Sequence, residues 1–285
     1  MFIITYKNFF LVITGIIVLL GLGSAWYFGL PLGIDFTGGS ILEVAYETPP
    51  DVMLLQSKVQ GLNLGGTMLQ PVGKNGILLR TRPLSEPERV ALTNAVGGRV
   101  VRFDSIGPVI GSELRAKSLW GISVVILLIV LYITFAFRKV SRPVASWKYG
   151  LTAVAALVHD MIVPTGFYAL YAHYTGAEVD VLFVTAILAI LGFSVHDTIV
   201  VFDRIRENLM KAPRGETFDA TVGKSLSQTF TRSINTSLTV ALVLVSLIIF
   251  GGASTTHFAV LLLAGIIAGT YSSIFLASPL LTFVL

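Results

Sequence analysis

The sequence predicts an α-helical integral membrane protein with six transmembrane helices and one α+β ferredoxin-like (βαββαβ) domain between the first and second helix. Three observations lead to this fold class. The 285 residues are 54% hydrophobic and 13% charged, with a mean hydropathy of +0.81, which is too apolar for a soluble globular protein. The apolar residues form six runs close to the roughly 20 residues that a bilayer requires. A polar segment of ordinary soluble composition separates the first two runs.

The predicted spans are Phe9–Leu30, Ser118–Phe137, Gly150–Ala172, Val181–Phe202, Ser233–Phe250 and His257–Val284. Lys7 and several small residues flank the first run, so a cleaved signal peptide is the alternative. The length of the run and the single preceding lysine favour a retained span. We therefore expect a first helix in 1–30, an extracytoplasmic α+β domain in 31–117, and helices two to six with basic cytoplasmic loops in 118–285.

The short loops predict the orientation, because cytoplasmic loops are rich in Lys and Arg. The loops after the second and fourth spans carry Arg138, Lys139, Arg142, Lys148, Arg204, Arg206, Lys211, Arg214 and Lys224. The alternate loops, 173–180 and 251–256, have neither residue type. We therefore expect a multi-pass protein of the cytoplasmic (inner) membrane with both termini cytoplasmic. The net charge of +4 is explained by these loops, so no nucleic-acid partner is predicted.

The segment 31–117 reads as strand and helix patterns in turn. "GSILEVAYE" alternates like a strand, "DVMLLQSKVQGL" is helix-like, and "GTMLQPVG" and "GILLRTR" flank a hairpin turn at 73–76. "SEPERVALTNAVG" has the helix cap Ser85, and "RVVRFDSIG" is a final strand. This order is the ferredoxin-like pattern, a common fold that says little about function. The segment has no catalytic or phosphate-binding motif and the chain has no cysteine, so we expect neither an enzyme nor a cofactor.

Ionisable residues within the predicted spans are the main functional signal. His159 and Asp160 lie near the middle of the third span, and His196 and Asp197 lie in the fourth. At i and i+3, Ser194 and Asp197 share a helix face. A charged group in the hydrocarbon costs about 2.5–3.5 kcal/mol on insertion scales. Each carboxylate therefore needs a use or a partner.

Two further patterns occur in the last two spans. The sequence Ser225, Thr229, Arg232, Thr236, Thr239 repeats at spacings of four, three, four and three residues, which predicts a polar stripe turned toward a cavity or another helix. Gly265, Gly269 and Ser273 form a ladder of small residues, which is typical of close helix packing.

These polar groups allow several interpretations. Asp197 is either a hydrogen-bonding group that holds helices together or part of a proton relay, since charge and burial decide whether a carboxyl group is ionised. Two His-Asp pairs also suggest a metal site. Neighbouring residues on one helix seldom bind a metal together, so such a site requires the third and fourth spans to face each other. We predict no metal.

Several motifs together resemble one family. "GIDFTGGS", "IGPVIGSEL", "VHD", "GFSVHDTIVVFDRIREN" and "SLSQTFTRSINTS" occur in the order found in the SecF family, the partners of SecD in the bacterial Sec accessory complex. The chain resembles that family over essentially its whole length. The family belongs to the resistance-nodulation-division superfamily.

The resemblance implies a function in protein export. It implies a heterocomplex with SecD that uses the proton-motive force in late preprotein translocation, with the SecY-SecE-SecG channel, SecA, unfolded preprotein and protons as partners. It identifies Asp197, Arg232 and Thr236 as proton-relay candidates, to which the residue patterns add Asp160 and His196. His196 stands where many relatives have Asn.

Alternatives stay open for three features. Gly33, Gly38 and Gly39 form either a hinge or a tight, rigid junction after the first span. The stretch "FDRIREN" is either a solvated continuation of the fourth span or a contact with SecY or SecA. A structural scaffold that conducts no protons and a small-molecule or ion exporter of the same superfamily are the alternative functions.

Overall fold

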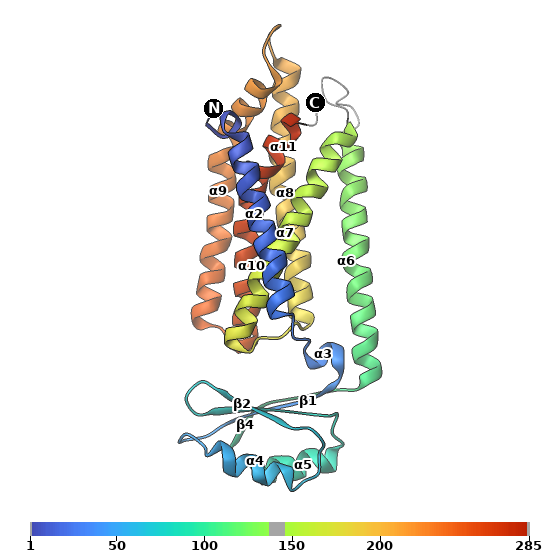
Figure 1. Ribbon diagram of the computed structural model, residues 1–285, viewed down its shortest axis with the longest axis vertical. Coiled ribbons are helices and arrows are strands. Elements are labelled where there is room, and N and C mark those ends of the chain that lie inside the picture. Colours follow the sequence, from blue (N-terminus) through green and yellow to red (C-terminus); the bar gives the residue numbers. More distant parts are fainter. Residues whose placement is uncertain (1, 137–145, 284–285) are drawn as a thin grey trace. The chain divides into compact units, whose positions relative to one another are not determined.

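The computed structural model describes residues 2–136 and 146–283, which fall into two compact units (Figure 1). One unit runs from Leu32 to Trp120. The other combines the segment up to Pro31 with the segment from Gly121 onward. The span ends predicted at Phe137 and Val284, and the loop cations Arg138, Lys139 and Arg142, lie outside the described residues.

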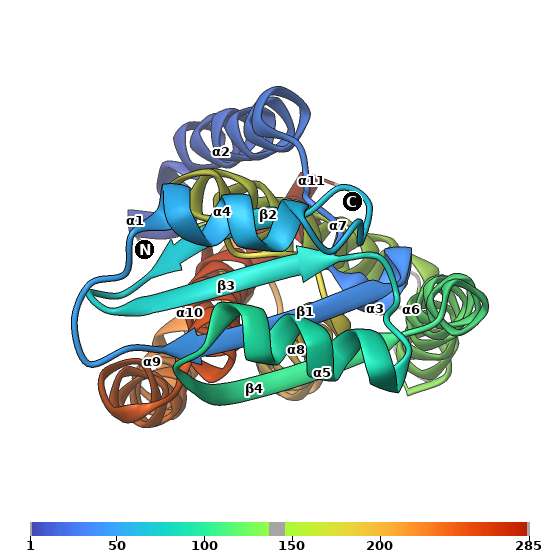
Figure 2. The same cartoon turned by 90° about the horizontal axis from the view of Figure 1, so that it is seen from below.

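The unit Leu32–Trp120 contains a small antiparallel sheet. After a short helix α3 (Ile34–Thr37) come β1 (Gly39–Ala45), α4 (Val52–Gln60), β2 (Met68–Val72), β3 (Gly76–Thr81), α5 (Glu86–Val96) and β4 (Arg99–Ile106). The strands lie in the order β2-β3-β1-β4, and every neighbouring pair is antiparallel. Helices α4 and α5 cover one face of the sheet (Figure 2).

Local sequence explains these elements. Gly73 adopts a positive φ of 62° in the turn between β2 and β3, where a side chain would be strained. Ser85 and Glu88 form a capping box that begins α5. Buried residues alternate along the two central strands, β1 and β3, so that one face of each carries apolar core side chains. With α4 and α5, that core consists of Leu42, Val44, Leu55, Val59, Leu64, Ile77, Leu79, Leu92 and Val96.

Within the described residues, six helical regions are long and apolar enough to cross a membrane. They comprise α2 (Lys7–Phe28), preceded by α1 (Phe2–Thr5), then α6 (Pro108–Ala136), α7 (Ser146–Thr175), α8 (Val181–Lys211), α9 (Phe218–Phe250), and α10 (Ala253–Ser272) continued by η1 (Ser273–Ala277) and α11 (Ser278–Phe283). Here η1 is a π-helix, in which each turn contains more residues than in an α-helix.

Two helices begin well before the spans that the sequence predicts. Helix α9 begins at Phe218 and not at Ser233, because Thr217 caps it by accepting a 3.3 Å hydrogen bond from the Ala220 N–H. Helix α6 begins at Pro108 and not at Ser118, since proline suits the first helical turn. Both helices contain polar turns ahead of the apolar stretch that the hydropathy detects.

Helix α10 packs against α7, α8 and α9, and α2 packs against α7. The predicted helical continuation of the fourth span is confirmed, because α8 runs on to Lys211. On that continuation Arg206 pairs with Asp203 at 3.3 Å, and Arg204 pairs with Glu207. The most buried spans, α7, α8 and α10, carry the polar groups described next.

Candidate functional site

Two carboxylates lie within the helical bundle. Asp160 of α7 is fully buried, with 0% of its surface exposed, and Asp197 of α8 is partly buried. Each carboxylate accepts hydrogen bonds from two serine hydroxyls that belong to other helical elements. The bundle therefore holds two acidic sites with the same kind of donor.

Asp160 has donors on α8 and α10. Its Oδ2 accepts from Ser272 Oγ at 2.7 Å and from Ser194 Oγ. Its Oδ1 lies 2.7 Å from Nδ1 of His159, which is also buried. Within the described part of the chain, His159 Nε2 has no hydrogen-bond partner. The ring of Tyr271 stacks on that of His159, with 6.0 Å between centroids.

Asp197 has donors on α9 and η1. Its Oδ1 accepts from Ser233 Oγ at 2.5 Å, and its Oδ2 accepts from Ser273 Oγ. Among residues 2–136 and 146–283 no cation forms an ion pair with Asp197. Ser194 shares a face of α8 with Asp197, as predicted, but its hydroxyl donates to Asp160, because α8 also packs against α7.

Three further relay candidates lie at the edge of this site. His196, Arg232 and Thr236 line a cavity of about 30 Å³ together with Asp197. A cavity needs about 10–15 Å³ to hold a water molecule, so this one has room for water. All three residues are exposed on the chain described here. The cavity brings Asp197, Arg232 and Thr236 together, but Asp160 does not line it.

The predicted polar stripe on α9 faces a cavity or another helix at most of its positions. Ser225 and Thr229 are buried, and Arg232 and Thr236 line the cavity at Asp197, whereas Thr239 is exposed. The inward face repeats every four residues, and its buried polar members are Thr221, Ser225, Thr229 and Ser233. Residues three and four positions apart both lie near one face of a helix. The sequence alone therefore did not show which residues of the stripe are buried.

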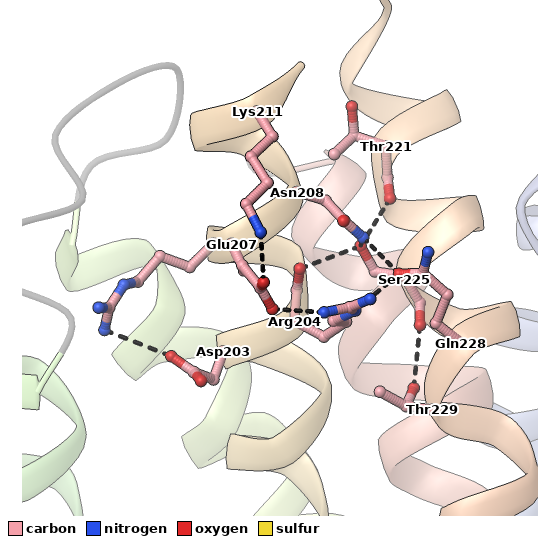
Figure 3. Close-up of polar contacts among 10 residues, drawn as sticks. Asp203, Arg204, Glu207, Asn208, Lys211, Thr221, Ser225, Gln228 and Thr229 are labelled. Carbon is pink, nitrogen blue, oxygen red and sulfur yellow. Dashed lines mark hydrogen bonds and ion pairs between the residues drawn. The ribbon is translucent and has the colours of Figure 1, made fainter.

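A polar network joins α8 to α9 next to the cavity (Figure 3). Asn208 Nδ2 donates to Ser225 Oγ and to Gln228 Oε1, each at 2.8 Å. Arg204 Nε donates to the same Gln228 oxygen at 2.7 Å. A cleft of about 390 Å³ runs along this network and shares Val200 and Arg232 with the cavity at Asp197. Polar side chains thus extend from the charged end of α8 to the carboxylate.

The small residues of α10 lie against α8. A Cβ atom on Gly265 would overlap Cδ1 and Cγ1 of Ile190, and one on Gly269 would lie 3.2 Å from Cβ of Ser194. Ser273 has an additional contact that the packing prediction did not include, its hydrogen bond to Asp197.

The predicted hinge glycines Gly38 and Gly39 are closely packed. A Cβ on Gly38 would lie 2.9 Å from Cα of Pro108, and one on Gly39 would lie 2.9 Å from the Thr81 carbonyl oxygen. Both have positive φ, whereas Gly33 has an ordinary φ of −72°. This geometry is what a tight junction requires, and hinge motion stays a prediction.

Sequence reasoning missed Ser233, Ser272 and Ser273 as carboxylate partners. It selected residues by charge, and serine is common in membrane helices as a small packing residue. One signal was present, since Ser272 and Ser273 are consecutive polar residues inside an apolar run. Their carboxylate partners depend on tertiary structure, because α10 packs against both α7 and α8.

The fold and the site define a class of protein: a multi-pass membrane protein whose helical bundle holds two carboxylates hydrogen-bonded by serine hydroxyls. Comparison with known families narrows that class. Residues 90–285 match the family model described as protein export membrane protein SecD/SecF, C-terminal, and residues 28–50 match the SecD/SecF GG motif. The chain belongs to the SecD/SecF family of protein export membrane proteins.

Individual relatives confirm the resemblance to SecF. The chain is 40% identical to the protein translocase subunit SecF of Thermobaculum terrenum, covering 98% of this chain and 92% of that protein. It is 33% identical to the Pseudomonas aeruginosa protein of the same name, covering 96% and 88%. The crystal structure of SecDF, a translocon-associated membrane protein from Thermus thermophilus, matches with a TM-score of 0.84 and 30% identity. That match covers 98% of this chain but only 38% of the SecDF chain.

Proposed function

We propose that the chain is a SecF-type subunit that pairs with a SecD-type subunit and uses the proton-motive force in late preprotein translocation across the cytoplasmic membrane. The names and lengths of the relatives support the subunit assignment. The SecDF chain, in which this chain corresponds to a part, supports a SecD-type partner. The channel proteins SecY, SecE and SecG, the ATPase SecA and an unfolded preprotein belong to the same proposal.

One observation carries the proton-coupled part of the proposal: Asp197 is held by two serine hydroxyls and, in the described chain, by no ion pair. A hydroxyl can donate to an ionised carboxylate or accept from a protonated one, so both forms of Asp197 can be hydrogen-bonded in place. An ionised carboxylate gains much more from a nearby guanidinium than a neutral acid does. A small movement of Arg232 within their shared cavity would therefore change the proton affinity of Asp197.

The remaining relay candidates surround this carboxylate. Thr236 and His196 line the same cavity, which has room for water. Asp160 is fully buried, and the consecutive residues Ser272 and Ser273 link it to Asp197. We therefore assign proton exchange to Asp197 with Arg232 and Thr236, and a second, buried proton-binding position to Asp160.

The proposal also includes a topology. Arg204, Arg206 and Lys211 at the end of α8 favour a cytoplasmic location for that end of the helix. With an even number of spans, both termini would then be cytoplasmic. The unit Leu32–Trp120 would lie outside, and its βαββαβ order with an antiparallel sheet supports a ferredoxin-like class.

Replacement of Asp197 tests the proposal. Asp197→Asn keeps the shape of the side chain but cannot gain or lose a proton. The variant is co-expressed with the SecD-type subunit, and release of an exported protein from spheroplasts is measured with and without the proton gradient. Asp203→Asn, on the exposed end of the same helix, is the matched control.

We expect gradient-dependent release to be lost in Asp197→Asn and kept in Asp203→Asn, with both complexes assembled. If Asp197→Asn still shows full gradient-dependent release, the carboxylate is a structural group and the chain acts as a scaffold for its partners.

A further inference from the structure

The consecutive residues Ser272 and Ser273 bind different carboxylates. Ser272 ends α10 and donates to Asp160 of α7, whereas Ser273 begins the π-helix η1 and donates to Asp197 of α8. Successive helical residues point about 100° apart, so one short segment reaches both acids. No other pair of adjacent residues in the described chain forms hydrogen bonds to both Asp160 and Asp197.

Each of these serines has a second acceptor close by. Ser272 Oγ lies 3.0 Å from the Gly269 carbonyl oxygen, and Ser273 Oγ lies 3.1 Å from the Thr270 carbonyl oxygen. A serine hydroxyl has one proton to donate and two lone pairs that accept. It can therefore donate to an ionised carboxylate, or turn its proton to the backbone carbonyl and accept from a protonated carboxyl group.

The remaining donors join the two acids less directly. Ser194 donates to Asp160 and lies three residues before Asp197 on α8, whereas Ser233 of α9 donates to Asp197. The other ionisable side chains around the pair are His159 and Tyr271 beside Asp160, and His196 and Arg232 beside Asp197. The single peptide bond between Ser272 and Ser273 thus connects donors of the two acids through fewer covalent bonds than the stretch of α8 from Ser194 to Asp197 does.

We propose that Ser272 and Ser273 are positioning residues that couple proton binding at Asp160 to proton binding at Asp197. When one acid takes up a proton, its serine turns toward the carbonyl oxygen one turn back. The peptide unit that joins the two serines shifts with this rearrangement, which alters the hydrogen bond that the second acid receives. This inference rests on the proposed function, since it takes Asp197 as a proton-binding group, and it assigns the coupling to a segment outside the family motifs recognised in the sequence.

The test is a double-mutant cycle on the purified complex with its SecD-type subunit in lipid nanodiscs. The carboxylic-acid C=O stretch of each buried acid is followed by infrared difference spectroscopy across a pH titration. The bands are assigned with Asp160→Asn and Asp197→Asn. The coupling is the change in the titration midpoint of Asp197 when Asp160 is replaced by Asn.

We expect this change to be about one pH unit with the native serines, the size at which two titrating groups behave as a pair. In the Ser272→Ala, Ser273→Ala background it should fall to a small fraction of that value. Ser272→Thr, Ser273→Thr keeps both hydroxyls and should restore it. Ser237→Ala is the matched control, because Ser237 joins α9 to Thr270 of α10 at 2.5 Å without contacting either acid.

Undiminished coupling in the double alanine background would overturn the proposal, because direct electrostatic interaction would then suffice. Equal loss in Ser237→Ala would overturn it as well, since general loosening of α10 would explain the effect. The proposed export function fails separately, through unchanged gradient-dependent release in Asp197→Asn.

Discussion

Gly166 of α7 lies directly against Gly21 of α2. A Cβ atom on Gly166 would overlap the Cα atom and the carbonyl oxygen of Gly21. Nearby, Ser24 Oγ of α2 donates a 2.7 Å hydrogen bond to the Gly166 carbonyl oxygen. The two helix backbones are therefore in contact, which holds the first span to the bundle.

Gly166→Ala should separate these helices. The added methyl group meets backbone atoms that cannot rotate away, and overpacking of this kind costs about 1–3 kcal/mol. We expect a lower melting temperature of the purified complex. Gly15→Ala on the exposed side of α2, where no atom lies within 4 Å of the new Cβ, is the control and should change little. Equal melting temperatures for both variants would contradict backbone contact at Gly166.

Gly265→Ala should be destabilising for a different reason, because its new Cβ meets a side chain. The nearest atoms are Cδ1 and Cγ1 of Ile190, both of which the new methyl group would overlap. Ile190→Ala removes both atoms, so the double variant should be more stable than the sum of the two single changes predicts. Thermal unfolding of all four proteins measures this coupling. Strict additivity would show that the two residues do not touch.

Asn208→Ala should weaken the connection between α8 and α9. The amide donates to two residues of α9, and its loss leaves their oxygens without that donor, at a cost of about 1–3 kcal/mol. Lys211→Ala, one turn later, removes only an exposed pair with Glu207 and should cost much less, because water screens such pairs. Thermal unfolding of the two variants should therefore rank Asn208→Ala as clearly less stable. If Lys211→Ala were the less stable variant, the hydrogen bonds of Figure 3 would not be the contacts that hold α8 to α9.

Acid should loosen α5 through Glu88. Its hydrogen bonds to the Arg82 guanidinium, and to the Ser85 N–H and hydroxyl, lower the pKa of Glu88 from 4.5 to about 2. A lowered pKa in the folded state means that this stabilisation is present above pH 4.5 and is lost as the pH falls from 4.5 toward 2.

Hydrogen exchange of the α5 amides in the intact complex, at about pH 5.5 and about pH 3, measures this loss. After correction for the intrinsic exchange rate, protection of α5 should decrease toward the lower pH. In the Glu88→Gln variant, protection of the α5 amides should already be lower than in the wild type at the higher pH. It should also change less between the two pH values. Glu47→Gln, an exposed carboxylate in the same unit, should behave like the wild type.

Much of the fold could be predicted because it depends on local patterns. The hydropathy runs located all six spans, and turn and cap residues such as Gly73 and Ser85 located the elements of the small sheet. Helix starts at Phe218 and Pro108 escaped the prediction, because a helix can continue in polar sequence where hydropathy gives no signal.

The site was less accessible to sequence reasoning. Asp160 and Asp197 stand out in an apolar run, since charge in hydrocarbon is costly. Their donors do not, because a serine gives the same local signal whether it packs or hydrogen-bonds. Ser194 is an example. Its spacing in the sequence places it on the same helix face as Asp197, but in the packed bundle its hydroxyl donates to Asp160.

The π-helix after Ser272 also fixes the rotational phase of the end of the chain. Because a π-helix contains more residues in each turn than an α-helix, the 5 residues Ser273–Ala277 turn the chain through a smaller angle than the same number of α-helical residues would. An α-helix of the same number of residues would point Thr282, which accepts a 3.1 Å hydrogen bond from Lys7, in a different direction. Lys7 also pairs with Asp219 of α9 at 2.8 Å. The π-helix thus lets one continuous helical segment donate to Asp160 and Asp197 and also bind Lys7 of α2.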